Sequence, residues 1–294
     1  MAPAESLLAS GTFHDYRGRP DVTRTPGYPA FLAFLIYIFG ANLRSVLVAQ
    51  AIALSLTVLL LYRLARKILP PVMAAGSGLL AAMFPWSAVL AGLPLSDGLF
   101  LLLLSLIFVV MNCVEANSGF ARALSGGALL GAITAAAVLT RPIVPLIFLV
   151  AIALALRSGA TQKRCWVVVA AMLICALAPL LLWQERNRRE GDLNAISDIA
   201  GKTAWRYLAS RVRAEASGQD RWQLSKSAYL EEQSWNLSSR EADKARWRRA
   251  MTVFKEYPLL TAYCFLRSAV EHAVHPSPDV LEYAWLSFQA DSIV

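Results

Sequence analysis

The sequence predicts an all-α fold, in which a polytopic helix bundle crosses a membrane and a helical tail follows it. Three observations support this prediction. The chain is 57% hydrophobic and 16% charged, whereas soluble domains average about 25% charged residues. Acidic residues nearly disappear between Arg24 and Gln184, where only Asp97 and Glu115 occur. The same region contains six apolar runs separated by short turns, which is typical of membrane helices packed as antiparallel neighbours.

The N-terminal region, residues 1–42, is interpreted as part of an outer loop followed by a re-entrant or interfacial helix. Residues 1–27 are polar, and one or two helical turns are expected at Pro3–Ala9. Tyr28–Phe39 is apolar, but its length falls short of the ~20 residues that cross the hydrocarbon core. A stiff turn is expected between these parts, because proline fixes φ and glycine permits positive φ. This turn consists of Pro26, Gly27, Tyr28 and Pro29.

The transmembrane bundle is expected at residues 43–184. Gly127 and Gly131 are four residues apart, a spacing that lets two helices approach closely. Lys and Arg gather at one set of helix ends, as at Arg63 and Arg66, and this set is therefore predicted to be cytoplasmic. The six predicted spans are Leu43–Leu69, Val72–Gly92, Asp97–Val114, Ala121–Thr140, Ile143–Leu156 and Cys165–Trp183.

The tail, residues 185–294, is predicted to be extracytoplasmic and largely helical. Ser239–Glu256 is charged and amphipathic, with acids early and bases late, as a helix dipole favours. Leu259–Val274 is more apolar but is interrupted by charges, so we expect an interfacial helix. The same orientation places the N-terminus outside without a signal segment, which predicts a further helix upstream of Met1.

Composition excludes several function classes. The net charge of +8 lies mostly in the apolar part, where positive charge reflects membrane topology rather than a nucleic-acid surface. The four cysteines fit neither a metal motif nor a disulfide framework. The sequence also lacks a phosphate-cradling glycine-rich loop, a nucleophile elbow and a zinc motif. No cofactor and no metal site are predicted from the residues, and dependence on a divalent metal stays open.

Four charged residues on the outer side are candidates for chemistry. Arg24 precedes the stiff turn and either binds a phosphate, which suits its guanidinium, or contacts lipid headgroups. Asp97 opens the third span and is either a helix N-cap or a functional carboxylate at membrane level. Arg141 either extends to headgroups or pairs with Asp97 or a phosphate. Arg186, just past the aromatic end of the last span, has similar interpretations.

Five segments follow one another along the chain in a characteristic order. They are RTPGYPAFLAFLIYIFG, SVLVAQAIALSLTVLLLYRLARKIL, LSDGLFLLLLSL, GGALLGAITAAAVLTRP and PLLLWQERN. In this order they resemble the integral-membrane glycosyltransferases of the GT-C superfamily, and the most similar branch contains protein O-mannosyltransferases and the lipid A aminoarabinose transferase. The resemblance covers about residues 5–190, and the ordered set is more specific than any one segment.

The resemblance implies transfer of a sugar from a polyprenyl-phosphate carrier to a lipid, glycan or protein acceptor on the extracytoplasmic side of a bacterial inner membrane. It implies an inverting displacement, in which a carboxylate takes the acceptor's proton and arginines stabilise the departing lipid phosphate. On this chain, Arg24, Arg141 and Arg186 are then candidates for phosphate contact. Asp97 is the catalytic candidate, in a role that the resemblance does not fix.

The sequence departs from the family pattern in its outer loop. The family's first transmembrane helix and its loop acid are expected upstream of Met1, and its later spans beyond the interfacial helix, so we interpret the chain as an interior portion. Glu5, Asp15 and Asp21 do not occupy the position of that acid. Two alternatives therefore stay open, a transporter of a lipid-linked or anionic solute and a non-catalytic membrane scaffold.

Overall fold

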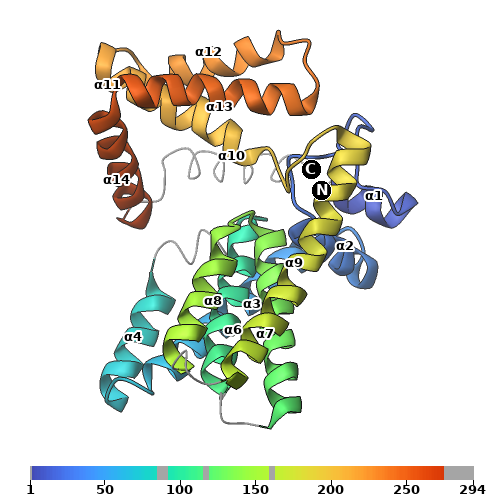
Figure 1. The fold of residues 1–294 in the computed structure, drawn as a ribbon, viewed down its shortest axis with the longest axis vertical. Coiled ribbons are helices and arrows are strands. Elements are labelled where there is room, and N and C mark those ends of the chain that lie inside the picture. Colours follow the sequence, from blue (N-terminus) through green and yellow to red (C-terminus); the bar gives the residue numbers. More distant parts are fainter. Residues whose placement is uncertain (1, 85–91, 115–118, 159–162, 275–294) are drawn as a thin grey trace. The chain divides into compact units, whose positions relative to one another are not determined.

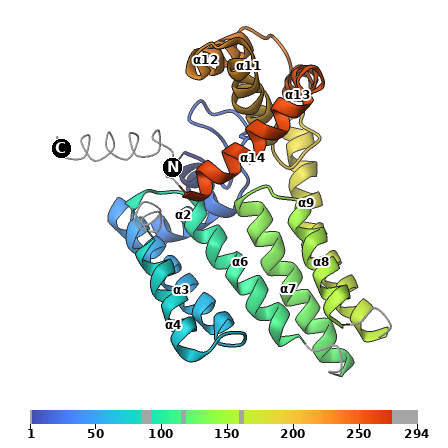
Figure 2. The ribbon, with the colours of Figure 1, turned by 90° about the vertical axis from the view of Figure 1, so that its left-hand side faces the viewer.

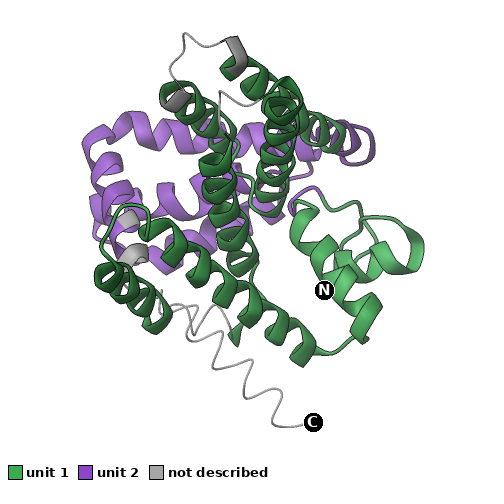
Figure 3. Cartoon of the chain, turned by 90° about the horizontal axis from the view of Figure 1, so that it is seen from below, with its two compact units in different colours: residues 1–21, 25–183 green, residues 22–24, 184–294 purple. Residues whose placement is uncertain are grey.

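A computed structural model describes residues 2–84, 92–114, 119–158 and 163–274. Within these ranges the chain forms helices, and its strand-like pairing is an isolated bridge between His14 and Pro20. The predicted all-α fold is thereby confirmed. The chain divides into two compact units, coloured separately in Figure 3, and the boundary falls within one long helix. The first unit contains residues 1–21 and 25–183, and the second contains residues 22–24 and 184–294.

The first unit is a bundle of apolar helices. Its helices α3, α6 and α7 lie side by side, as Figures 1 and 2 show. Together with α9 they are long and apolar enough to cross a membrane. These four helices are α3 (Leu43–Ala65), α6 (Ser96–Cys113), α7 (Phe120–Thr140) and α9 (Lys163–Gly191), the last of which continues into the second unit.

Two of the six predicted spans correspond to shorter helices. The prediction Val72–Gly92 meets α4 (Pro71–Met83), which has 13 residues, and residues 85–91 lie outside the described part. The prediction Ile143–Leu156 meets α8 (Pro145–Ser158), which has 14 residues. Proline explains both starts, because its fixed φ and missing N–H suit the first turn of a helix. By the length and composition of the described helices, four of the six predicted spans are candidate membrane crossings.

Helices α7 and α9 approach each other through small residues. A methyl group on Gly127 would lie 2.5 Å from the carbonyl oxygen of Val168. A methyl group on Gly131 would lie 2.4 Å from the carbonyl oxygen of Met172. Neither backbone oxygen can give way, so glycine is required at both positions. The close approach predicted from the four-residue spacing is confirmed.

The first unit also contains two further helices, α1 (Ala2–Ser10) and α2 (Gly27–Phe39). They pack on each other and on α3 around a small apolar cluster. With 13 residues, α2 is too short to cross a membrane alone, as the sequence predicts. The buried members of this cluster are Ala4, Leu32, Ala33, Leu35 and Val46.

The second unit is a helical domain with its own core. Trp205, Val212, Ala250 and Cys264 are buried in that core. The predicted helix Ser239–Glu256 is present and begins with a capping box between Ser238 and Glu241. The helices of this unit are α10 (Ile199–Lys202), the π-helix η1 (Thr203–Ala209), α11 (Ser210–Ser217), α12 (Arg221–Gln233), α13 (Ser239–Glu256) and α14 (Pro258–Val274).

Candidate functional site

The first unit pairs Asp97 with Arg141. Asp97 is the second residue of α6 and Arg141 follows the last residue of α7. Because these neighbouring helices run in opposite directions, the two ends meet, and Nη1 of Arg141 lies 2.6 Å from Oδ1 of Asp97. Their side chains are 45% and 26% exposed, respectively. Of the interpretations left open for Arg141, this conformation shows the pair with Asp97.

A buried amide holds the turn that precedes Asp97. The Gln50 side chain on α3 is fully buried, and its Nε2 donates a hydrogen bond of 2.8 Å to the carbonyl oxygen of Leu95. Its Oε1 is also buried and has no hydrogen-bond partner among the described residues. Sequence reasoning missed Gln50. The available signal was an amide within the apolar run Leu43–Ala65, because polar groups at membrane level usually have a function.

The stiff turn predicted at Pro26–Pro29 is instead the start of a helix. Pro26 is the N-cap of α2, which begins at Gly27, and the φ of Gly27 is not positive. Glycine is needed there for space rather than for an unusual φ. A methyl group on Gly27 would lie 2.6 Å from Oγ1 of Thr140 and 2.7 Å from the carbonyl oxygen of Leu139. The first turn of α2 therefore rests on the last turn of α7, next to Arg141.

Tyr28 belongs to the same end of the bundle. Its hydroxyl is buried and has no hydrogen-bond partner within the described ranges. Burial raises the pKa of the Tyr28 phenol, and the nearby negative charge of Asp97 raises it further. The ring packs against the apolar cluster that contains Val46, one turn before Gln50 on α3. Tyr28, Gln50, Asp97 and Arg141 therefore gather where α2, α3, α6 and α7 meet.

Arg24 belongs to the second unit, in the segment 22–24. Lys202 donates from Nζ to Oγ1 of Thr23 at 2.6 Å, and Ser197 donates from its hydroxyl to the carbonyl oxygen of Thr23. The backbone N–H of Asp198 donates to the carbonyl oxygen of Val22. The tail thus fixes the two residues that precede Arg24, whose side chain is exposed.

Arg186 also belongs to the second unit and lies on α9. Its Nε is 2.9 Å from Oε2 of Glu190, and its Nη1 donates to Oδ1 of Asn187 at 3.0 Å. The side chain is only 15% exposed. A phosphate at Arg186 would compete with Glu190. Asp97 and Arg141 are thus paired in the first unit, while Arg24 and Arg186 are both residues of the second.

The second unit also contains a buried ion-pair network centred on Arg246. Arg246 contacts Asp198 at 3.0 Å through Nη1 and donates from Nε to Glu232 at 2.8 Å. Arg206 donates to the other oxygen of Glu232 at 2.7 Å, and Lys202 contacts Asp198 at 2.8 Å. Lys202 therefore joins this network to the segment that carries Arg24.

This network predicts acid sensitivity of the tail. Burial acts to raise the pKa of Glu232, but hydrogen bonds from Arg206 and Arg246 outweigh it and hold the pKa below the usual 4.5. A lowered pKa in the folded state stabilises the fold above the unfolded value, and this contribution is lost as pH falls through the folded value. Amide exchange in α12 and α13 should therefore rise below about pH 4.

The variant Glu232→Gln provides the control for this effect. At pH 7 it should destabilise the tail by about 3 kcal/mol, because Arg206 and Arg246 lose the buried carboxylate that they share. Between pH 3 and 6, amide exchange in this variant should also depend less on pH than in the unmodified chain. The difference should correspond to about one titrating group. Acid sensitivity identical to that of the unmodified chain would contradict the role of Glu232.

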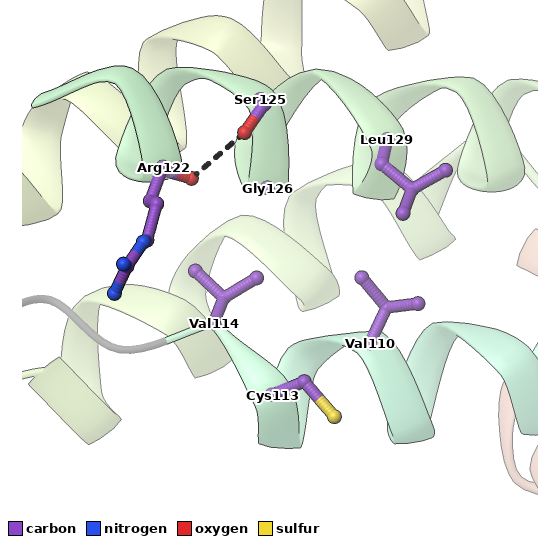
Figure 4. A pocket seen from close by; sticks show the side chains of 7 residues that line it. All are labelled: Val110, Cys113, Val114, Arg122, Ser125, Gly126 and Leu129. Atoms are coloured by element: carbon purple, nitrogen blue, oxygen red, sulfur yellow. Dashed lines mark hydrogen bonds between the residues drawn. The ribbon is translucent and has the colours of Figure 1, made fainter. Parts of the chain in front are cut away.

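A groove at the opposite end of α6 and α7 lies apart from these residues. It has a volume of about 560 Å³, and Figure 4 shows Arg122 at one side of it. Since α6 has 18 residues and rises 1.5 Å per residue, the groove is about 25 Å from Asp97. The lining residues are Val110, Cys113, Val114, Arg122, Ser125, Gly126 and Leu129.

Comparisons with known proteins agree with the resemblance. No curated protein and no solved structure matches the chain. Among protein families, residues 23–183 match the family described as dolichyl-phosphate-mannose-protein mannosyltransferase. The matched segment contains Arg24, Asp97 and Arg141, and it covers more than half of the sequence. The chain therefore belongs to the dolichyl-phosphate-mannose-protein mannosyltransferase family, a GT-C family of membrane glycosyltransferases.

Proposed function

We propose that the chain transfers a sugar from a polyprenyl-phosphate carrier to an extracytoplasmic acceptor, and that Asp97 and Arg141 act at the reacting centre. The observation that carries this proposal is their contact of 2.6 Å at the end of α6 and α7. A carboxylate beside a guanidinium supplies the two functions that the reaction needs, a proton acceptor and a phosphate ligand. Family membership supports the class of reaction.

The proposed step is a single displacement. The acceptor's hydroxyl oxygen attacks the anomeric carbon while the bond from that carbon to the phosphate oxygen breaks. Asp97 takes the hydroxyl proton, and the departing lipid phosphate keeps the electron pair of the broken bond. Arg141 stabilises the charge that develops on the phosphate. Its guanidinium has five N–H donors, so it can contact Asp97 and a phosphate oxygen together. Arg24 and Arg186 are proposed as further phosphate ligands.

The proposed orientation places the Asp97 end of the bundle and the tail outside, in a bacterial inner membrane. Cys113 lies at the other end of α6 and is exposed, so it should be cytoplasmic. A membrane-impermeant maleimide added to intact cells should label the tail variant Ser234→Cys and leave Cys113 unlabelled. Peptide mapping after permeabilisation, when both should react, provides the control. Labelling of Cys113 alone in intact cells would reverse the orientation.

Transfer is tested with the purified chain in lipid nanodiscs. A polyprenyl phosphomannose labelled in the sugar is supplied together with a membrane extract as the source of acceptor. The expected result is release of polyprenyl phosphate and passage of the label to extract material. A transporter would instead carry the lipid-linked sugar across vesicles with its phosphate bond intact, and a scaffold would bind the donor without turnover. Either result would overturn the proposed function.

A further inference from the structure

Two buried polar atoms at the end of the bundle that carries Asp97 have no hydrogen-bond partner in the described part of the chain. They are Oε1 of Gln50 and the hydroxyl oxygen of Tyr28. Buried polar groups in proteins are nearly always hydrogen-bonded, so two exceptions at one end of a bundle indicate a ligand or ordered water. Gln50 is also fully buried, in a helix whose other contacts are largely apolar.

The local packing places both groups at the reacting centre. Gln50 donates through Nε2 to Leu95, two residues before Asp97, so its Oε1 lies beside the start of α6. Tyr28 follows Gly27, which packs against Thr140, the residue before Arg141. Burial and the charge of Asp97 act together to raise the pKa of the Tyr28 phenol. The Tyr28 ring packs on the cluster formed with Val46, which precedes Gln50 by one helical turn.

The chemistry of the two atoms favours a sugar over a phosphate. An amide oxygen only accepts hydrogen bonds, and a phenol both donates and accepts. A sugar hydroxyl donates to the first and exchanges a hydrogen bond with the second, whereas phosphate oxygens would repel the amide oxygen. Arg141, which carries only donors, suits the phosphate instead.

We propose that Gln50 and Tyr28 bind a hydroxyl group of the donor sugar and thereby select the sugar that the enzyme accepts. This inference rests on the proposed function. In this arrangement two sets of residues bind the two parts of the donor. Arg141 contacts the phosphate, and Gln50 and Tyr28 contact the sugar. An enzyme site that hydrogen-bonds a substrate hydroxyl discriminates strongly against an analogue without it, because its own buried groups are then left unpaired.

Two probes separate the sugar from the phosphate. Binding of polyprenyl phosphomannose and of the matching polyprenyl phosphate is measured on the full chain in nanodiscs. Gln50→Met keeps the length of the side chain and removes the amide. It should weaken binding of the phosphomannose about tenfold and leave binding of the phosphate unchanged. Tyr28→Phe should show the same pattern, and Arg141→Ala should weaken binding of both probes.

Thr57→Val provides the matched control. Thr57 is buried on α3, two turns after Gln50, and its hydroxyl already donates to the carbonyl oxygen of Ala53 at 2.9 Å. This variant should bind both probes as the unmodified chain does. If Gln50→Met weakens both probes equally, Gln50 only supports the turn at Leu95 and the inference is wrong. Unchanged phosphomannose binding in both Gln50→Met and Tyr28→Phe would also overturn it.

Failure of the proposed function gives a different pattern. In that case the unmodified chain binds neither probe, or it binds the phosphomannose and transfers no sugar in the nanodisc assay, as a transporter or a scaffold would. The first result removes the sugar site together with the function. The second leaves binding measurable, and the Gln50 and Tyr28 variants still decide whether the sugar is bound as proposed. If Arg141→Ala binds both probes as tightly as the unmodified chain does, only the phosphate role of Arg141 is wrong.

Discussion

Asp97→Asn is expected to abolish sugar transfer while the helix bundle stays folded. Asparagine has nearly the same size, but it carries no charge and cannot take a proton from the acceptor. Loss of a general base costs about 10²- to 10⁴-fold in rate. The ion pair is partly exposed, and such pairs contribute only about 0–1 kcal/mol to stability. Initial rates and thermal unfolding, measured on the same nanodisc samples, separate the two effects.

Substitutions of Arg141 should lower the rate of sugar transfer in graded steps. Arg141→Lys keeps the charge and loses the planar fork, so a residual rate is expected. The rate of Arg141→Ala should fall close to background. The control is the partly exposed ion pair between Arg267 and Glu215 at 2.8 Å in the tail. Glu215→Gln removes a comparable contact and should leave transfer unchanged. Unchanged transfer in Asp97→Asn, or an equal loss in Glu215→Gln, would contradict a catalytic role for this pair.

The bundle was largely predictable from hydropathy, because long apolar runs leave few alternatives in a membrane. Helices α3, α6 and α7 follow the predicted runs closely, whereas α9 continues beyond the predicted end at Trp183 to Gly191. The bounds of the shorter α4 and α8 were less predictable, since each begins at a proline and hydropathy alone does not mark that start. The sequence gives no signal for the π-helix at Thr203–Ala209, whose Trp205 is buried in the core of the tail.

The candidate site was predictable only in part. Asp97 and Arg141 stand out as charges at membrane level, and a pair between them was one of the open interpretations. Gln50 did not stand out, because its role depends on a contact with Leu95 across forty-five residues. The pairing of Arg186 with Glu190 follows an ordinary i, i+4 spacing. The interpretation of Arg186 as a phosphate ligand did not take this pair into account. A long-range contact therefore accounts for the missed Gln50, whereas the pair of Arg186 with Glu190 could have been predicted from local spacing.

Gly27→Ala is expected to impair transfer, because the added methyl group has no room between α2 and α7. The added carbon would lie 2.7 Å from the carbonyl oxygen of Leu139, which is backbone and cannot rotate away. Helix α2 must then shift from α7, and Tyr28 and Arg141 move apart. Overpacking of this kind costs about 1–3 kcal/mol, and a misplacement of about 1 Å in a catalytic site costs about 10²-fold in rate.

Two further variants show whether the effect comes from this contact. Gly76→Ala adds the same methyl group to α4, where nothing lies within 4 Å, so transfer and stability should not fall. Thr140→Ala removes the hydroxyl nearest to Gly27 but leaves the Leu139 carbonyl in place. The double variant Gly27→Ala/Thr140→Ala should therefore remain impaired. Full transfer in Gly27→Ala, or full rescue by Thr140→Ala, would show that the packing of α2 against the α7 backbone does not position the site.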